Sequence, residues 1–132
     1  MQKVLYENNI DAVVESAGTE NWNVGQPADQ RAIKIAKEKG INLRTHRARQ
    51  LRTGDLDNFD MIIVMDRRIE NAVRKIAPGT AQDKIKYMLE DECGKPGEIL
   101  DPYFSSESAF YELYDLLSDC CARLFQQCQG KP

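Results

Sequence analysis

The sequence predicts an α/β domain in three layers, a sandwich with a short parallel sheet covered by helices on both sides. Segments with the apolar pattern of strands alternate with segments that have the 3.6-residue period of helices. One strand candidate, MIIVM at 61–65, is apolar without interruption, which is typical of a strand buried on both faces of a parallel sheet. We expect a single domain over residues 1–129, followed by a tail at 130–132.

The first half of the chain contains two helix candidates and one strand candidate. Residues 1–8 have helical spacing but no N-terminal cap, so they resemble the back half of a helix. Ala12 to Glu15 follow as a short strand that runs into a glycine-containing loop. Residues 28–39 are amphipathic, and Gly40 is a good C-terminal stop. Two short helical turns are expected in the connecting region, at 45–51 and 53–59.

The second half continues the alternation of strands and helices. Asp66 can cap a helix whose apolar stripe ends before Pro78-Gly79. The segment KIKYML at 84–89 predicts another strand, and the long loop 90–108 follows it. A final helix carries one apolar face, made of Phe110, Leu113, Tyr114, Leu117, Cys121, Leu124 and Phe125.

Composition excludes several classes of function. The net charge of −3 gives no general attraction to nucleic acid or anionic membranes, so neither is expected as a partner. No apolar run is long enough to span a bilayer, and no signal peptide is visible. The four cysteines form no Cys-x-x-Cys pair, and the single histidine, His46, is far from them in sequence. We therefore expect no metal, no cofactor, and buried reduced thiols in a cytoplasmic protein.

The loops that follow the predicted strands are the place to look for a ligand site. In open parallel sheets, ligands bind at the carboxyl ends of the strands. Here those loops are 16–25, the turn at Asp66, and 90–108. The last one contains ILDPYF, which places a carboxylate next to a rigid ring and two aromatic rings. Such a group could hand a proton to a molecule bound against the rings.

Four segments, in this order and spacing, resemble the low-molecular-weight protein tyrosine phosphatase family: SAGTENWNVGQPAD, HRARQL, FDMIIVMD and DPYF. The resemblance extends over essentially the whole chain. It implies the phosphotyrosine phosphatase I-like fold and the hydrolysis of aryl phosphate monoesters through a cysteinyl-phosphate. The implied substrate is a phosphotyrosine protein or a small aryl phosphate.

The resemblance also implies roles for particular residues. Asp101 matches the general acid, which protonates the leaving phenolate and later activates water. Trp22 and Tyr103 match the aromatic walls around the substrate ring. Phe104 stands where the family often has a second tyrosine, and Asn23 lies beside the Trp22 wall.

Two further positions match supporting residues of the family. His46 matches a residue that braces the phosphate loop from behind. Asp66 closes the strand beside that loop, and its own pattern also predicts a helix cap.

The chain departs from the family at the nucleophile. The family's thiolate lies in a loop Cys-x-x-x-x-x-Arg between the first strand and the first helix, where backbone N–H groups and the arginine cradle the phosphate. No cysteine of this chain has an arginine six positions later: Ile99, Gln126 and Gln127 stand there for Cys93, Cys120 and Cys121. We therefore expect the first, central strand and the nucleophile to be missing, and this 132-residue chain to be inactive.

Three function classes stay open on these observations. The first is a tyrosine phosphatase whose chain lacks its start, and the second is a non-catalytic relative that binds a partner. The third, an arsenate reductase, would need more cysteines near the loop 90–108 than Cys93 alone. A missing central strand would uncover the edges of its neighbours. Either the two remaining strands then close the gap directly or two chains pair in a homodimer, and we expect the homodimer.

Overall fold

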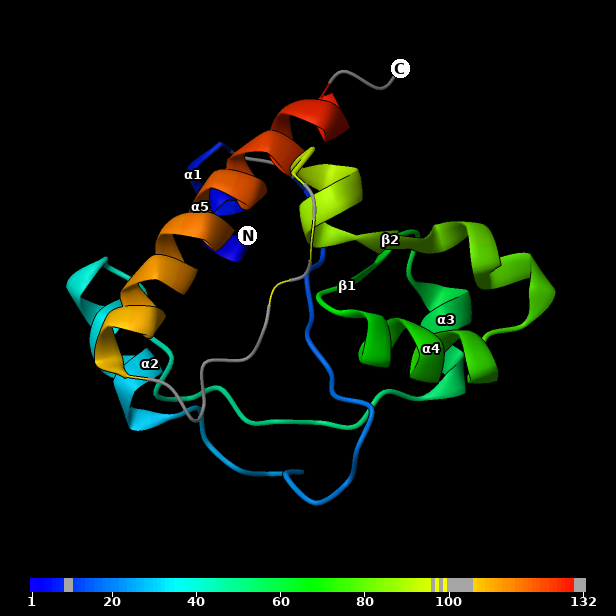
Figure 1. Ribbon diagram of the computed structural model, residues 1–132, viewed down its shortest axis with the longest axis horizontal. Coiled ribbons are helices and arrows are strands. Elements are labelled where there is room, and N and C mark those ends of the chain that lie inside the picture. Colours follow the sequence, from blue (N-terminus) through cyan, green and yellow to red (C-terminus); the bar gives the residue numbers. More distant parts are fainter. Residues whose placement is uncertain (9–10, 96, 98, 100–105, 130–132) are drawn as a thin grey trace.

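The computed structural model describes residues 1–8, 11–95, 97, 99 and 106–129. Figure 1 shows these residues in two groups of elements. In one group, α1 (Gln2–Glu7) and α2 (Gln30–Glu38) both contact α5 (Glu107–Gln129). The other group holds α3 (Thr53–Asn58), β1 (Ile62–Val64), α4 (Arg67–Ile76) and β2 (Ile85–Tyr87). The predicted α/β fold with a short parallel sheet is confirmed, and strands and helices alternate from β1 to α5.

The two strands pair in parallel, as the buried run MIIVM predicted. Ile62 lies opposite Ile85, and Val64 lies opposite Tyr87. The connection between them contains α4 and a 3₁₀-helix at Gly79–Lys84. Parallel strands need a crossover of this kind, because a tight turn can join only antiparallel strands.

The second strand is shorter than the predicted segment 84–89. It ends at Tyr87, and a π-helix at Met88–Glu92 follows directly. The Asp91 carboxylate accepts the N–H of Tyr87 at 2.7 Å, and the N–H of Cys93 reaches the carbonyl of Met88 at 3.0 Å. These local bonds turn the chain, so Met88 joins the apolar cluster against α5 instead of extending the ladder.

Two expectations for the connecting regions were wrong. Residues 12–15 are not a strand: within the described part of the chain they have no ladder partner, and Val13 is 74% exposed. An extended segment becomes a strand only when a neighbour accepts and donates its backbone hydrogen bonds. Residues 45–51 are not helical, because they pair with the loop before α2 through the bridges Gly18–Gln50 and Pro27–Arg47.

The predicted signals at Asp66 and Gly40 are confirmed, and Asp29 is an additional helix cap. Asp66 caps α4, and its carboxylate accepts the N–H of Ile69 at 2.8 Å. Asp29 caps α2 in the same way, with the N–H of Arg31 as donor at 2.8 Å. Gly40, with φ +80°, follows the end of α2 in the left-handed conformation that glycine adopts without strain.

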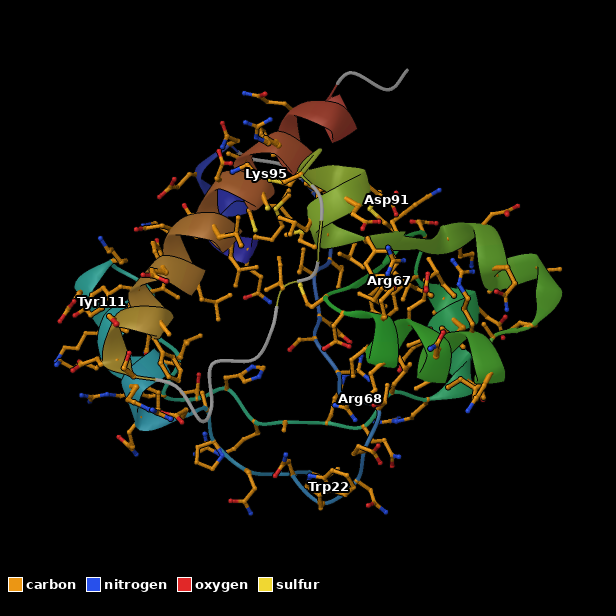
Figure 2. The ribbon with its side chains drawn as sticks, viewed as in Figure 1. Trp22, Arg67, Arg68, Asp91, Lys95 and Tyr111 are labelled. Carbon is orange, nitrogen blue, oxygen red and sulfur yellow. The ribbon has the colours of Figure 1, made fainter. Side chains whose placement is uncertain are left out.

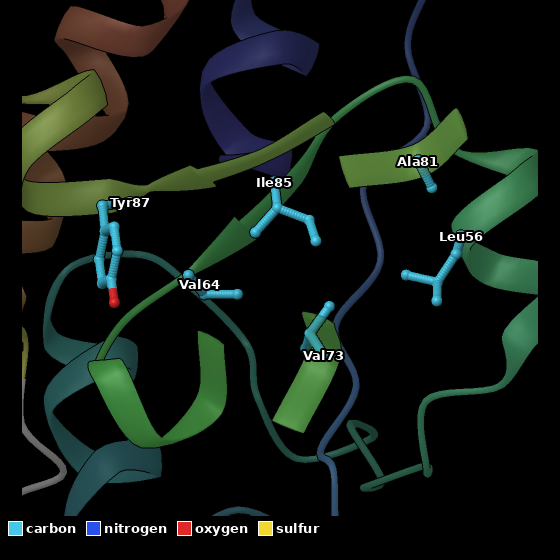
Figure 3. Packing of buried hydrophobic residues seen from close by; sticks show 6 residues of the cluster. All are labelled: Leu56, Val64, Val73, Ala81, Ile85 and Tyr87. Atoms are coloured by element: carbon cyan, nitrogen blue, oxygen red, sulfur yellow. The ribbon is translucent and has the colours of Figure 1, made fainter. Parts of the chain in front are cut away.

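Two clusters of buried residues meet at β1, and further buried residues lie on α1, α2 and α5. The first cluster, drawn in Figure 3, packs α3 and α4 against one face of the strand pair and contains Leu56, Val64, Val73, Ala81, Ile85 and Tyr87. The second packs the other face against α5 and contains Met88, Leu89, Cys93, Ile99 and Cys120. Because successive side chains of a strand alternate, Val64 joins the first cluster, while Ile63 and Met65 pack against the second.

The predicted apolar face of α5 packs inward, and one residue joins it that was not predicted. Phe110 and Leu124 are buried, and Cys121 packs against the second cluster as predicted. Cys120, beside Cys121, is also fully buried. In the described part of the chain no helix is both long and apolar enough to cross a membrane.

Candidate functional site

The candidate site begins where β1 ends. Met65 follows the strand, and Asp66 then starts α4 with its carboxylate bound to the N–H of Ile69. The N–H of Ile99, which comes from the loop after β2, donates to the carbonyl of Met65 at 2.8 Å. The segments that follow the two neighbouring strands therefore meet at the carboxyl end of β1, as the parallel topology predicted.

Three of the predicted site residues, Asp101, Tyr103 and Phe104, lie outside the described residues. Their nearest described neighbour before them in the chain is Ile99, which is 5% exposed and belongs to the second core cluster. A buried side chain and a backbone hydrogen bond to Met65 thus hold the start of the segment ILDPYF.

Trp22 projects from a tight loop. The N–H of Gln26 reaches the carbonyl of Asn23 at 2.9 Å, and Gly25 takes a positive φ of +81° that closes the turn. The indole is 69% exposed, and Figure 2 shows it at the outer edge of the molecule. Asn23 is exposed beside it. Tryptophan is usually largely buried, so a free indole on a well-formed loop is a candidate binding group.

The Trp22 loop is fastened to the segment that begins at His46. The N–H of Gly25 donates to the carbonyl of Ala48 at 2.8 Å, and the N–H of Ala48 donates to Gln26 at 3.0 Å. His46 is exposed, and its backbone carbonyl accepts a hydrogen bond from Arg47 at 2.8 Å. The structure thus brings the predicted residues Trp22, Asn23 and His46 into one paired loop region.

The first turn of α4 connects this loop region to the end of β1. Arg68 forms an ion pair with Glu20, two residues before Trp22, at 3.9 Å, and Figure 2 shows Arg68 between α4 and the Trp22 loop. Asp66 lies two residues before Arg68. The ion pair is long and exposed, so it contributes little energy, but it places the Trp22 loop beside the N-terminus of α4.

A second group of charges at the ends of the strands was not anticipated from the sequence. Arg67 binds both carboxylate oxygens of Glu90, at 2.7 and 2.8 Å, and its guanidinium stacks 3.9 Å above the ring of Tyr87. The hydrogen bonds that Arg67 donates to the Glu90 carboxylate raise the pKa of Arg67. Tyr87 in turn donates to Glu70 at 2.9 Å. No local signal could reveal this network, because Arg67 and Glu90 are 23 positions apart and meet only through strand pairing.

The described thiols do not contribute to this site. Cys93 and Cys120 are buried in the second core cluster, and Cys121 packs against that cluster. Among residues 1–8, 11–95, 97, 99 and 106–129, no group of three His, Cys, Asp or Glu side chains is arranged to hold a metal ion. The described part of the site thus offers an aromatic ring, a capped helix terminus and charged groups, but no nucleophile.

The comparisons with known proteins all point to the same family. The family model described as "Low molecular weight phosphotyrosine protein phosphatase" matches residues 1–131. A relative of that name from Schizosaccharomyces pombe is 33% identical over 122 residues, which cover 90% of this chain and 76% of the relative. A putative low molecular weight protein-tyrosine-phosphatase from Synechocystis is 35% identical over 115 residues, which cover 85% of this chain and 72% of the relative.

A solved structure supports the same family. The crystal structure of a protein tyrosine phosphatase from Entamoeba histolytica superposes with a TM-score of 0.90 at 30% sequence identity. The match covers 97% of this chain and 83% of the other. Nearly the whole described fold therefore corresponds to that of a solved phosphatase.

Proposed function

The chain belongs to the low molecular weight phosphotyrosine protein phosphatase family, and from this premise we propose that it supplies the proton donor and the aromatic walls of an aryl phosphate site. The observation that carries the proposal is the hydrogen bond from Ile99 to Met65, which fastens the segment ILDPYF to the end of β1. The proposed substrate is a phosphotyrosine protein or a small aryl phosphate.

Asp101 is the proposed general acid. It follows Ile99 by two positions, and Ile99 is held at the carboxyl end of β1 beside the start of α4. Departure of a phenolate from phosphorus is eased when a carboxylic acid protonates the leaving oxygen. The same carboxylate, once deprotonated, can activate the water that regenerates the enzyme.

Trp22 is proposed as one wall for the substrate ring, with Tyr103 and Phe104 on the other side. The exposed indole supports this role, because a flat apolar surface that is free in the unliganded chain can stack on a phenyl ring with little entropic cost. Asn23 is the proposed polar group at the rim of that wall. His46 and Asp66 are proposed as supporting residues, and the cap that Asp66 makes on α4 supports this role for it.

A polypeptide of these 132 residues is proposed to be inactive by itself. Phosphate transfer in this family implies a thiolate, and no cysteine here has an arginine six positions later. Without the thiolate no phosphoenzyme can form. Without the arginine and the loop N–H groups, the charge on the transferring phosphoryl group is not stabilised.

Turnover of p-nitrophenyl phosphate by three purified polypeptides tests the proposal. The first is the 132-residue chain, the second carries an N-terminal extension with a strand, a Cys-x-x-x-x-x-Arg loop and the front of a helix, and the third carries the same extension with Cys replaced by Ser. We expect turnover only by the second.

Two outcomes would contradict different parts of the proposal. Turnover by the 132-residue chain that survives repurification would disprove its inactivity. The second polypeptide, with the N-terminal extension, could melt cooperatively and bind a phosphotyrosine peptide without hydrolysing it. That result would reject the enzyme and favour the alternative, a non-catalytic binding relative.

A further inference from the structure

Two cysteines that the proposed function does not use lie together in the second core cluster. Cys93 follows the π-helix after β2, and Cys120 is in the middle of α5. Both are nearly inaccessible, at 2% and 0% exposure, and both are free thiols. Both side chains pack in the same buried cluster, and the neighbouring Cys93 thiol helps to raise the pKa of Cys120.

A second contact aligns the same two stretches of chain. Lys95, two residues after Cys93, forms an ion pair with Asp119 at 3.3 Å, and Asp119 immediately precedes Cys120. The backbone N–H of Lys95 is also fixed, because it donates to the carbonyl of Leu89 at 3.0 Å. Figure 2 shows Lys95 beside α5. Residues 93–95 are thus held against Asp119 by an ion pair and by the contact of the Cys93 sulfur with the Asp119 carboxylate.

The two thiols differ in their distance from solvent. The Cys93 sulfur lies 3.8 Å from a carboxylate oxygen of Asp119, whose side chain is about half-exposed, so Cys93 is just below the surface. Cys120 is deeper. Burial raises the pKa of the Cys120 thiol to about 12, and its contact with Cys93 adds to the shift. Cys93 is therefore the sulfur that an oxidant from solvent meets first.

We propose that Cys93 and Cys120 are an oxidation site that forms a disulfide between the loop after β2 and α5 when the chain meets a peroxide. The Cys93 thiolate attacks one oxygen of hydrogen peroxide, the O–O bond breaks, and the Cys93 sulfenic acid forms. The hydroxide that leaves takes up the proton lost by the Cys93 thiol and becomes water. The sulfur of Cys120 then attacks the Cys93 sulfur, the S–O bond breaks, and the hydroxyl leaves as water with the thiol proton. Two thiols are oxidised to one disulfide while one peroxide is reduced to two water molecules.

The proposed bond would close a loop of 26 residues, 94–119, and this loop contains the segment ILDPYF. A crosslink of this kind stabilises mainly by restricting the unfolded chain. For a loop of this length the melting temperature should rise by about 10 °C on oxidation and return after reduction. The bond would also fix the base of the segment that carries the proposed general acid.

Peptide mapping of the peroxide-treated full chain tests the proposal. Cleavage after glutamate separates Cys93, in peptide 93–98, from peptide 113–132, which carries the other three cysteines. We expect the intact mass to fall by about 2 Da, as two thiol hydrogens are lost. We expect the two peptides to be linked through Cys120 in fragmentation spectra of the unmodified sequence.

Variants provide the matched comparison. The link and the rise in melting temperature should persist in Cys121→Ser and disappear in Cys93→Ser and Cys120→Ser. If a buried serine prevents a variant from folding, the peptide map of the unmodified chain still tests the proposal by itself. Linkage through Cys121 or Cys128, linkage between chains, addition of oxygen atoms without any link, or retention of all four thiols would each overturn the proposal.

Discussion

The backbone N–H of Ile99 donates to the carbonyl oxygen of Met65 across 2.8 Å. This bond joins the loop after β2 to the residue that follows β1, immediately before Asp66. Since Ile99 is also buried in the second core cluster, the start of ILDPYF is held both by its backbone and by its side chain. The proposed acid, Asp101, comes two residues later in the chain.

Replacing the proposed acid should slow catalysis in the polypeptide extended with the phosphate loop. Asp101→Asn should lower kcat by about 10²–10⁴ with phenyl phosphate, because a positioned general acid contributes that much. The loss should shrink with p-nitrophenyl phosphate, whose leaving group needs less protonation. Asp60→Asn, a change at an exposed aspartate, is the control. An unchanged kcat with phenyl phosphate would disprove the assignment of Asp101.

Removing the exposed indole should weaken substrate binding without affecting the fold. In the same extended polypeptide, Trp22→Ala should raise KM for a phosphotyrosine peptide on the order of 10-fold, because one aromatic wall is lost. The melting temperature should stay constant, since the side chain is 69% exposed. Val24→Ala, at a half-exposed residue in the same loop, is the matched control. Equal KM values for both variants would contradict the wall role.

The contribution of the Asp66 cap to stability should be measurable in the 132-residue chain. Asp66→Ala should lower the free energy of unfolding by about 1 kcal/mol, because the N–H of Ile69 loses its acceptor. Asp66→Ser should recover most of the loss, since serine is also a good cap. Urea denaturation measures the free energy of unfolding of both variants. Asp60→Ala, at a residue outside any helix, is the control. A loss in Asp66→Ala no larger than in the control would show that the cap contributes nothing.

The acid stability of the chain should depend on Asp55. Arg49 donates to its carboxylate at 2.9 Å, which is the main reason that the pKa of Asp55 is lowered, and the N–H of Arg52 adds a second hydrogen bond at 2.8 Å. A carboxyl whose pKa is lower in the folded than in the unfolded state stabilises the fold above its unfolded pKa. That stabilisation is lost as the pH falls through the folded pKa.

Asp55→Asn should therefore destabilise the chain at pH 7 and flatten its loss of stability below about pH 4, where an ordinary aspartate titrates. Thermal melts from pH 2 to pH 7 measure both effects. Asp57→Asn, an exposed position in the same helix, should leave the pH profile unchanged. If Asp55→Asn and Asp57→Asn gave the same profile, the ion pair with Arg49 would have no role in acid stability.

A homodimer should form through unpaired extended segments. In the described part of the sheet, β1 pairs only with β2, and residues 12–15 have no ladder partner. The side chain of Val13 in this segment is 74% exposed, so a second chain can reach it. Such segments can pair with a second chain. Light scattering at micromolar concentration should give twice the monomer mass, and Val13→Lys should shift the chain to monomer.

The control for the dimer is Ile76→Lys, because Ile76 is an exposed apolar residue at the end of α4 and does not belong to the segment 12–15. It should leave the mass unchanged. A monomer with an ordinary cooperative melt in the unmodified chain would reject the dimer.

Local signals in the sequence determined the helices and the family. The cap at Asp66 and the apolar spacing after it predicted α4, and MIIVM predicted a parallel strand, because each depends on residues within one or two turns of chain. The motifs around Trp22 and DPYF predicted the family, which the comparisons confirmed. These properties need no knowledge of which segments meet.

Contacts between distant segments were decided by the tertiary structure alone. Residues 12–15 have the composition of a strand, yet no neighbour pairs with them in the described chain, and a strand exists only as part of a ladder. The Arg67–Glu90 pair and the meeting of Cys93 with Cys120 depend on how β2 and α5 pack. A sequence specifies such pairs only through the whole set of packing contacts, so no local pattern of residues predicts them.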